Sequence, residues 1–135
     1  IVDATVVSIK SRNIHKVGLL GTRFTMEGEF YSGRLKAHGL DVVTPNQTDR
    51  EIVHRVIYQE LVLGKIVPES RQEFRRIIQN LQEEGAEGIV LGCTEIGLLI
   101  KEEDTYLPIF DTTRLHAQAA VDVALGKIAF EEFLP

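Results

Sequence analysis

The sequence predicts an α/β fold: a short parallel sheet of about four strands in the order 2-1-3-4, with helices on both faces. Short apolar runs bounded by turn residues alternate with segments of helical period, which is typical of such a sheet. The length of 135 residues corresponds to a single domain over residues 1–135, since domains usually have ~100–200 residues. Hydrophobic residues make up 44% of the chain, enough to bury a core.

Four short apolar runs predict the strands. They cover residues 16–21, 40–44, 89–92 and 107–110. When the second strand lies on one side of the first and the third on its other side, the order is 2-1-3-4. The loops after the first and third strands, residues 21–25 and 92–95, then meet at the switch point where open α/β sheets bind ligands.

Capping residues and apolar spacing predict the helices. Asp3 and either Asp111 or Thr112 are expected to cap the first and the last helix. Residues 48–51 and 70–73 have the spacing of a capping box. Apolar residues at helical spacing indicate the buried faces of four helices. The first of these, over residues 25–38, has Phe30 and Leu35; the second has Ile52, Val53, Val56, Ile57 and Leu61; the third has Phe74, Ile77, Ile78 and Leu81; and the last has Leu115, Ala119 and Val123. Glycine is expected to end three helices, at Gly39, Gly85 and Gly126.

Charge and hydropathy exclude several classes of protein. Twenty acidic against fifteen basic residues give a net charge of −5, without the basic patch that binds nucleic acid or an anionic membrane. No apolar stretch approaches the ~20 residues that span a bilayer. No cationic segment leads into an apolar run as in a signal peptide. We therefore expect a cytoplasmic protein with neither a nucleic-acid nor a membrane partner.

Cys93 is the single cysteine, which excludes an intrachain disulfide and a multi-thiolate metal site. No pair of histidines or carboxylates has the spacing of metal ligands, so no metal is expected. Cys93 follows an apolar strand and precedes residues 94–99, which can form a helix. A thiol at a helix N-terminus is favoured as thiolate by free N–H groups and the helix dipole, so its pKa is predicted below ~8.5. The alternative is a small buried hydrophobe.

The loop over residues 21–25 offers two hydroxyls and an arginine at the end of the first strand. It is interpreted as a cradle for a carboxylate or phosphate, or alternatively as an ordinary loop with Thr25 as N-cap. It lacks the glycine-rich nucleotide-binding patterns. His116, near the start of the last helix, is a candidate to face the same site. Solvent exposure is expected for His15, His38 and His54, for Arg75 and Arg76, and for residues 102–104.

Residues 92–96, Gly-Cys-Thr-Glu-Ile, resemble the second cysteine motif of the aspartate/glutamate racemase family. Residues 17–26, 30–35 and 110–117 agree with that family in the same order, so the resemblance covers residues 3–124. It implies a PLP-independent amino-acid racemase that needs no cofactor, built from two similar α/β domains with one cysteine each. One thiolate removes the α-proton of the amino acid while the opposite thiol delivers a proton to the other face.

On this resemblance, Cys93 is one of the two catalytic thiols. The substrate-binding residues are expected to be Thr22, Arg23, Thr25, Thr94, Glu95 and His116, where the threonine hydroxyls stabilise the substrate carboxylate. The chain starts at Ile1 inside a helical segment and holds one cysteine, so it is expected to be the C-terminal half, inactive alone. The partner is then the missing N-terminal half, toward which a terminal helix over residues 112–130 packs. Self-association as a homodimer is a second way to cover the exposed domain face.

Substrate preference within the family is indicated by two positions. Glu95 after the Cys-Thr pair resembles the aspartate or broad-specificity branch, because glutamate-specific members tend to carry histidine there. Val62 and Leu63 stand before Gly64, where some aspartate racemases have a lysine for the side-chain carboxylate, and Arg23 is the candidate replacement. Two alternatives stay open: a single-cysteine decarboxylase or isomerase of the same superfamily, and a non-catalytic α/β module that binds a small carboxylate.

Overall fold

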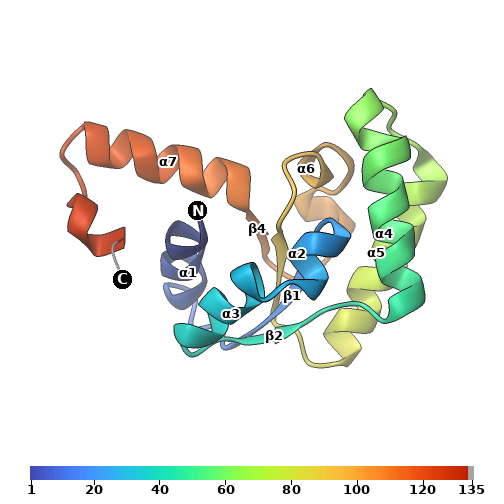
Figure 1. Ribbon diagram of the computed structural model, residues 1–135, viewed down its shortest axis with the longest axis horizontal. Helices are drawn as coiled ribbons and strands as arrows, with labels where there is room; N and C mark the ends of the chain where they lie inside the picture. Colours follow the sequence, from blue (N-terminus) through green and yellow to red (C-terminus); the bar gives the residue numbers. More distant parts are fainter. Residues whose placement is uncertain (134–135) are drawn as a thin grey trace.

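A four-stranded parallel sheet forms the centre of the computed structural model, which describes residues 1–133 (Figure 1). The strands are β1 (Lys16–Leu20), β2 (Asp41–Val43), β3 (Gly88–Leu91) and β4 (Ile109–Asp111). Their order is β2-β1-β3-β4, and β1 and β3 pair in parallel from Val17 opposite Gly88 to Leu20 opposite Leu91. The predicted fold class and strand order are therefore confirmed.

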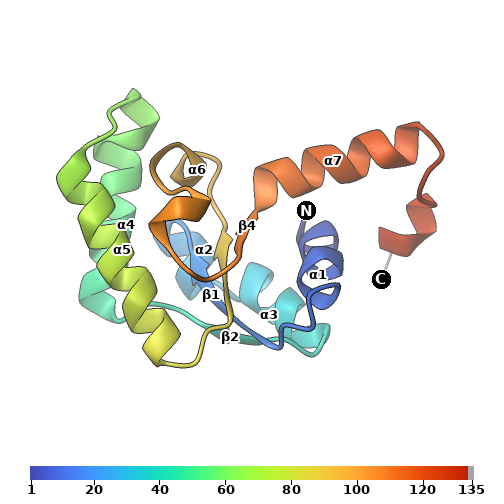
Figure 2. The ribbon, with the colours of Figure 1, turned by 180° about the vertical axis from the view of Figure 1, so that it is seen from behind.

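Two groups of helices cover the two faces of the sheet, as both views show (Figures 1 and 2). On one face lie α1 (Val2–Lys10), α3 (Glu29–Ala37) and α7 (Thr112–Ala124). On the other lie α2 (Arg23–Glu27), α4 (Gln47–Gln59), α5 (Pro68–Glu83) and α6 (Ile96–Leu99). Three 3₁₀ turns complete the described chain: η1 (Leu61–Leu63), η2 (Glu102–Asp104) and η3 (Phe130–Phe133).

Each face of the sheet has its own apolar core because successive side chains of a strand point to opposite faces. In β1, Val17 and Leu19 pack with α1 and α3, whereas Leu20 packs with α4 and α5. The predicted apolar faces of α4 and α5 are buried there: Val53, Val56, Ile57, Phe74, Ile77, Ile78 and Leu81. None of the helices within residues 1–133 has both the length and the apolar character needed to cross a membrane.

The helix predicted over residues 25–38 is two helices, α2 and α3, separated at Gly28. Gly28 is extended, and a Cβ at this position would lie 2.5 Å from the carbonyl oxygen of Phe24. The break shifts the apolar register of α3, so the expectation for Phe30 is wrong. Its side chain is 67% exposed, while Tyr31 and Leu35 are buried.

Two predicted capping boxes are wrong because an upstream residue starts each helix. Asn46 caps α4 by accepting the N–H of Asp49 at 3.0 Å. In α5 the first residue is Pro68, whose missing N–H costs nothing at that position. Ser70 instead donates to Glu60 at 2.6 Å.

The expected cap of the first helix is also wrong, whereas that of the last is confirmed. Asp3 lies inside the first turn of α1 and accepts from Arg34 and His38 of α3. Asp111 caps α7 by accepting from the backbone N–H groups of Thr113 and Arg114.

The expectation of a solvated acidic stretch at residues 102–104 is wrong for Asp104. The side chain of Asp104 is only 1% exposed and forms an ion pair with Arg75 of α5. The neighbouring Arg76 is half-exposed but binds the buried Asp49 of α4. These two ion pairs join α5 to η2 and to α4, so Arg75, Arg76 and Asp104 hold the fold together and are not merely solvated surface charges.

Candidate active site

The loops after β1 and β3 lie side by side at the carboxyl edge of the sheet. The N–H of Gly92 donates to the carbonyl oxygen of Leu20 at 2.7 Å. A Cβ at Gly21 or at Gly92 would lie within 3 Å of the Thr25 side chain, so only glycine allows the two loops to approach it this closely. The structure thus brings together the two segments that the strand order predicts at the switch point.

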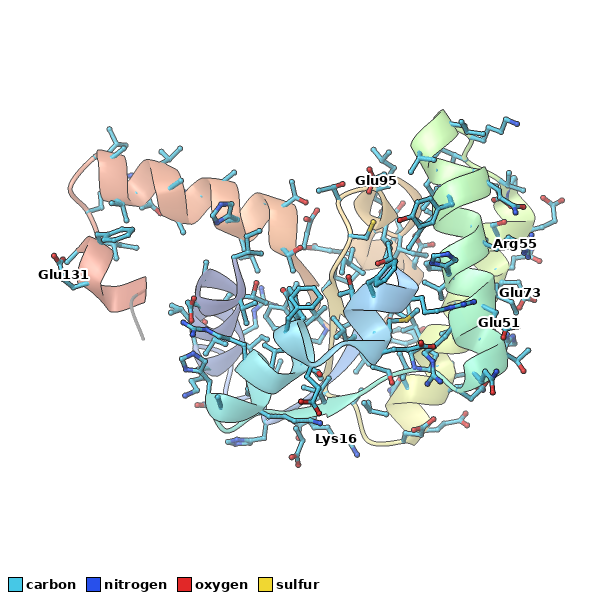
Figure 3. The ribbon with its side chains drawn as sticks, viewed as in Figure 1. Lys16, Glu51, Arg55, Glu73, Glu95 and Glu131 are labelled. Atoms are coloured by element: carbon cyan, nitrogen blue, oxygen red, sulfur yellow. The ribbon has the colours of Figure 1, made fainter. Side chains whose placement is uncertain are left out.

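Cys93 lies in the second of these loops, half-buried, and its thiol has one side-chain hydrogen-bond partner in the part of the chain that the structure describes. Its Sγ donates to Oε2 of Glu95 at 2.9 Å, and the Thr94 hydroxyl donates to the same oxygen at 2.6 Å. Glu95 is labelled in Figure 3 at the end of the molecule where α6 begins. Thiol, hydroxyl and carboxylate therefore form one hydrogen-bonded group on three consecutive residues.

Burial and the Glu95 carboxylate raise the pKa of the Cys93 thiol to about 11. The prediction of a lowered pKa is therefore wrong. The helix after Cys93 begins only at Ile96 and has four residues, so its dipole is too small to offset burial and the nearby negative charge. The hydrogen bonds from Cys93 and Thr94 lower the pKa of Glu95, so at neutral pH the pair is thiol and carboxylate.

The loop after β1 presents its two threonine hydroxyls together. Thr22 Oγ1 and Thr25 Oγ1 are 3.3 Å apart. Thr22 occupies the N-cap position of α2, but its side chain caps no backbone N–H group. Thr25 is buried within α2 and is not its N-cap, whereas Arg23 is exposed.

His54 of α4 contacts this loop, which the sequence did not indicate. The backbone N–H of Arg23 donates to Nδ1 of His54 at 3.2 Å, and the imidazole packs against the ring of Tyr58. His54 was expected to face solvent, yet it is half-buried. The contact between His54 and the loop arises from the packing of α2 on α4, and local sequence patterns do not encode this packing.

A groove of about 620 Å³ adjoins the two loops, and only some of the predicted site residues line it. Thr25, Thr94 and His116 line it, together with residues of α1 and α3. Thr22, Arg23, Cys93 and Glu95 lie outside its lining. Thr112, which the sequence offered only as an alternative cap of the last helix, fixes the start of α7 here by donating to the carbonyl oxygen of Leu91 at 2.8 Å.

Two further observations concern other candidate sites in the described part of the chain. A larger hollow of about 1010 Å³ lies between α5 and η2, lined by charged residues and no thiol. Within residues 1–133, no group of three or more histidine, cysteine, aspartate or glutamate side chains is arranged to hold a metal ion. The loops around Cys93 are therefore the best candidate for an active site.

Residues 1–120 match the pattern of the Asp/Glu/hydantoin racemase family. Over 103 residues the chain is 33% identical to an uncharacterized protein from the pnlA 3′ region of Pectobacterium carotovorum subsp. carotovorum. That match covers 76% of this chain and 67% of the relative.

Solved structures give the same result. A candidate Asp/Glu racemase from Yersinia pestis is 55% identical with a TM-score of 0.88, and an aspartate racemase homologue from Pyrococcus horikoshii OT3 is 37% identical with a TM-score of 0.85. Each match covers 92% of this chain but 54% of the other, so the chain spans about half the length of these proteins. The Picrophilus torridus aspartate racemase shares the fold alone, at 23% identity and a TM-score of 0.66 over 93% of this chain and 51% of that one.

Proposed function

This chain belongs to the Asp/Glu/hydantoin racemase family, and from that membership we propose that it forms one half of a PLP-independent amino-acid racemase site. Cys93 is one of two catalytic thiols, and the other belongs to a second α/β half. The match to only 54% of the Yersinia pestis protein, at 55% identity, supports a second half of this kind. The terminal helix, expected over residues 112–130, ends at Ala124 as α7, and we propose that it packs toward this second half.

The observation that carries the proposal is the hydrogen bond from the Cys93 thiol to Glu95 at the carboxyl ends of β1 and β3. Because the carboxylate holds the thiol protonated, Cys93 rests in the form of an acid. In one direction the opposite thiolate removes the α-proton, and the electron pair of that C–H bond moves into the substrate carboxylate. The pair then forms a new C–H bond with the proton of Cys93 on the other face.

The reverse direction uses the same groups with their roles exchanged. Cys93, left as a thiolate, removes the α-proton, and the opposite thiol donates one. The nearby Glu95 carboxylate makes this thiolate a strong base, because it disfavours the negative charge on sulfur. Neither enantiomer is preferred by such an arrangement, which suits a racemase.

The polar residues around the thiol supply the remaining roles. Thr22, Thr25 and, once its hydroxyl turns away from Glu95, Thr94 donate to the substrate α-carboxylate, whose charge grows as the α-proton leaves. Glu95 accepts from the substrate ammonium group, and His116 borders the site from α7. Arg23 is exposed and pairs with no carboxylate of residues 1–133, so it is available for a side-chain carboxylate.

The substrate is an acidic amino acid, with aspartate and glutamate both accepted. Val62 and Leu63 lie in η1, which packs against α6 beside the Cys93 loop. These apolar side chains offer no charge partner for a strictly aspartate-specific pocket. Arg23 has a long and mobile side chain, which accommodates acidic side chains of either length.

The test uses the chain co-expressed with the part of the Yersinia pestis protein that it does not cover, called the paired protein below. We expect it to interconvert the enantiomers of aspartate and glutamate, measured by chiral chromatography, without added PLP and in the presence of hydroxylamine. Alkylation of Cys93 with iodoacetamide abolishes this activity. Racemisation that survives complete alkylation, or that requires PLP, contradicts the proposal.

A further inference from the structure

His54 ties the start of α2 to α4 through one hydrogen bond. The backbone N–H of Arg23 donates to its Nδ1 at 3.2 Å. A backbone N–H can only donate, so Nδ1 accepts and the neutral ring carries its proton on Nε2. This is the one contact from α4 that reaches the Thr22 loop among the side-chain hydrogen bonds of residues 1–133.

The imidazole of His54 is held in place by its own helix. Tyr58, one turn further along α4, packs against it with ring centroids 4.7 Å apart and planes inclined by 49°. At the other end of α2, Arg50 of α4 binds Glu27 at 3.1 Å. Each end of α2 is therefore attached to α4 by one polar contact, and His54 provides the one beside the site.

The position of the Thr22 hydroxyl depends on the path of this loop. Thr22 caps no backbone group of α2, and among the side chains of residues 1–133 its hydroxyl meets only that of Thr25, at 3.3 Å. Arg23 is the next residue, so fixing its N–H also fixes the peptide that carries the Thr22 side chain. A misplacement of about 1 Å in a catalytic donor can reduce a rate by about 10²-fold.

We propose that His54 is a positioning residue that orients the Thr22 hydroxyl toward the substrate carboxylate through the N–H of Arg23. This inference rests on the proposed function, in which Thr22 is a donor to that carboxylate. His54 itself touches neither the substrate nor the Cys93 thiol. Its contribution is to keep the donor in place as negative charge develops in the transition state.

Two substitutions separate the acceptor from the bulk of the ring. His54→Asn retains an acceptor, because asparagine Oδ1 occupies nearly the place of Nδ1, whereas His54→Leu keeps a branched side chain and removes the acceptor. The matched control is Glu27→Gln, which weakens the contact at the far end of α2. Thermal melting of all three shows whether the fold is retained.

The first measurement follows the Arg23 amide in the 135-residue chain by ¹H–¹⁵N NMR, without any substrate. We expect hydrogen exchange of this amide to be about tenfold faster in His54→Leu, since one hydrogen bond contributes ~0.5–1.5 kcal/mol. In His54→Asn and Glu27→Gln the exchange stays close to that of the wild type. An Arg23 amide that is unaffected by His54→Leu overturns the inference.

The second measurement is the kinetics of racemisation in the paired protein. We expect His54→Leu to lower kcat about tenfold while KM changes little, and His54→Asn to restore kcat. Thr22→Val lowers kcat more, by about 10²–10³. In the double variant, His54→Leu adds no further loss, because the donor that it positions is already gone.

The outcomes distinguish the two proposals. Additive losses in the double variant, or a kcat that His54→Asn does not restore, contradict the positioning role. If the paired protein does not racemise, or Thr22→Val leaves kcat unchanged, the proposed function of the Thr22 loop fails. The Arg23 amide alone then decides whether His54 holds the loop.

Discussion

Burial and the two residues that follow Cys93 in the sequence control its protonation state. Glu95 accepts a hydrogen bond from the thiol and another from the Thr94 hydroxyl, and burial further disfavours the thiolate. A group whose pKa is raised in the folded state holds its proton more tightly there than in the unfolded chain. In the absence of substrate, the folded protein therefore favours the thiol form of Cys93 at neutral pH.

The first prediction concerns the reactivity of Cys93 with iodoacetamide in the 135-residue chain. Because burial and Glu95 raise its pKa to about 11, the labelling rate is expected to rise with a midpoint near that pH. Glu95→Gln removes the carboxylate charge and moves the midpoint down toward the ~8.5 of a free thiol. The control is Glu102→Gln, an exposed carboxylate in η2. A wild-type midpoint at or below ~8.5 contradicts this account.

At the scale of single elements, the close approach of the two loops depends on glycine. A Cβ at Gly92 would lie 2.9 Å from Thr25 Cγ2 and 3.1 Å from the carbonyl oxygen of Leu20. One of these contacts is with backbone, which cannot move aside. Gly33, in the middle of α3, meets nothing nearer than 3.7 Å.

We therefore predict opposite effects of the same substitution at these two glycines. Gly92→Ala lowers the free energy of unfolding by about 1–3 kcal/mol through overpacking. Gly33→Ala raises it by roughly 0.5–1 kcal/mol, because alanine favours a helix interior. Urea unfolding of both variants measures the difference. Equal stabilities would mean that the loops do not approach each other as described.

The ion pair between α4 and α5 supports a second prediction at this scale. Asp49 is buried and accepts from Arg76 at 2.6 and 3.2 Å, and from Asn46 at 3.1 Å. The Arg76 guanidinium is the main cause that lowers the pKa of Asp49. Asp49→Asn is expected to lower the free energy of unfolding by about 1–2 kcal/mol at pH 7, and exposed Glu51→Gln to change it little.

The pH dependence of that difference has a defined sign. A carboxyl group with a lowered pKa in the fold stabilises it above the unfolded value of ~3.9, and this stabilisation is lost as pH falls through the folded pKa. The wild type and Asp49→Asn should therefore approach equal stability below pH ~4. Urea unfolding between pH 3 and 7 measures this, and a constant difference over that range argues against the Asp49–Arg76 pair.

The strands and the strand order could be predicted because apolar runs and chain connectivity determine them. The helix caps and the helix break at Gly28 could not be predicted from apolar runs and chain connectivity. The capping-box spacing at residues 48–51 competes with Asn46, two residues upstream, and only the folded chain shows which one caps α4. Gly28 is extended between α2 and α3, at a position where any Cβ would clash with the Phe24 carbonyl oxygen, and composition does not reveal this.

The location of the site was predictable for the same reason as the strand order, whereas its electrostatics were not. The carboxyl ends of β1 and β3 meet because the strands are neighbours. The pKa of Cys93 depends on how far the thiol is buried and where the Glu95 carboxylate points. His54 reaches the site from a helix more than 25 residues along the chain, so sequence spacing carries no sign of it.

At the scale of the whole molecule, the candidate site lies at one edge of one sheet. Thr22, Arg23 and Cys93 all follow the carboxyl ends of β1 and β3 in a single sheet. The helices α2, α6 and α7 begin at the same edge of that sheet (Figure 1). Exposed apolar residues surround this edge, among them Phe24 and Leu98 at 76% and 52% exposure. Groups on one edge can reach one face of a planar carbanion, so inversion at the α-carbon requires a donor or acceptor on the other face.

The most direct test of the two-thiol account is proton NMR of L-aspartate and L-glutamate in D₂O, with chiral chromatography of the products. The 135-residue chain alone is expected to exchange no α-proton and to invert neither substrate. The paired protein is expected to do both, and Cys93→Ala in the paired protein abolishes inversion while its melting temperature stays close to that of the parent. Racemisation by the 135-residue chain alone, or by the paired Cys93→Ala protein, would contradict the account.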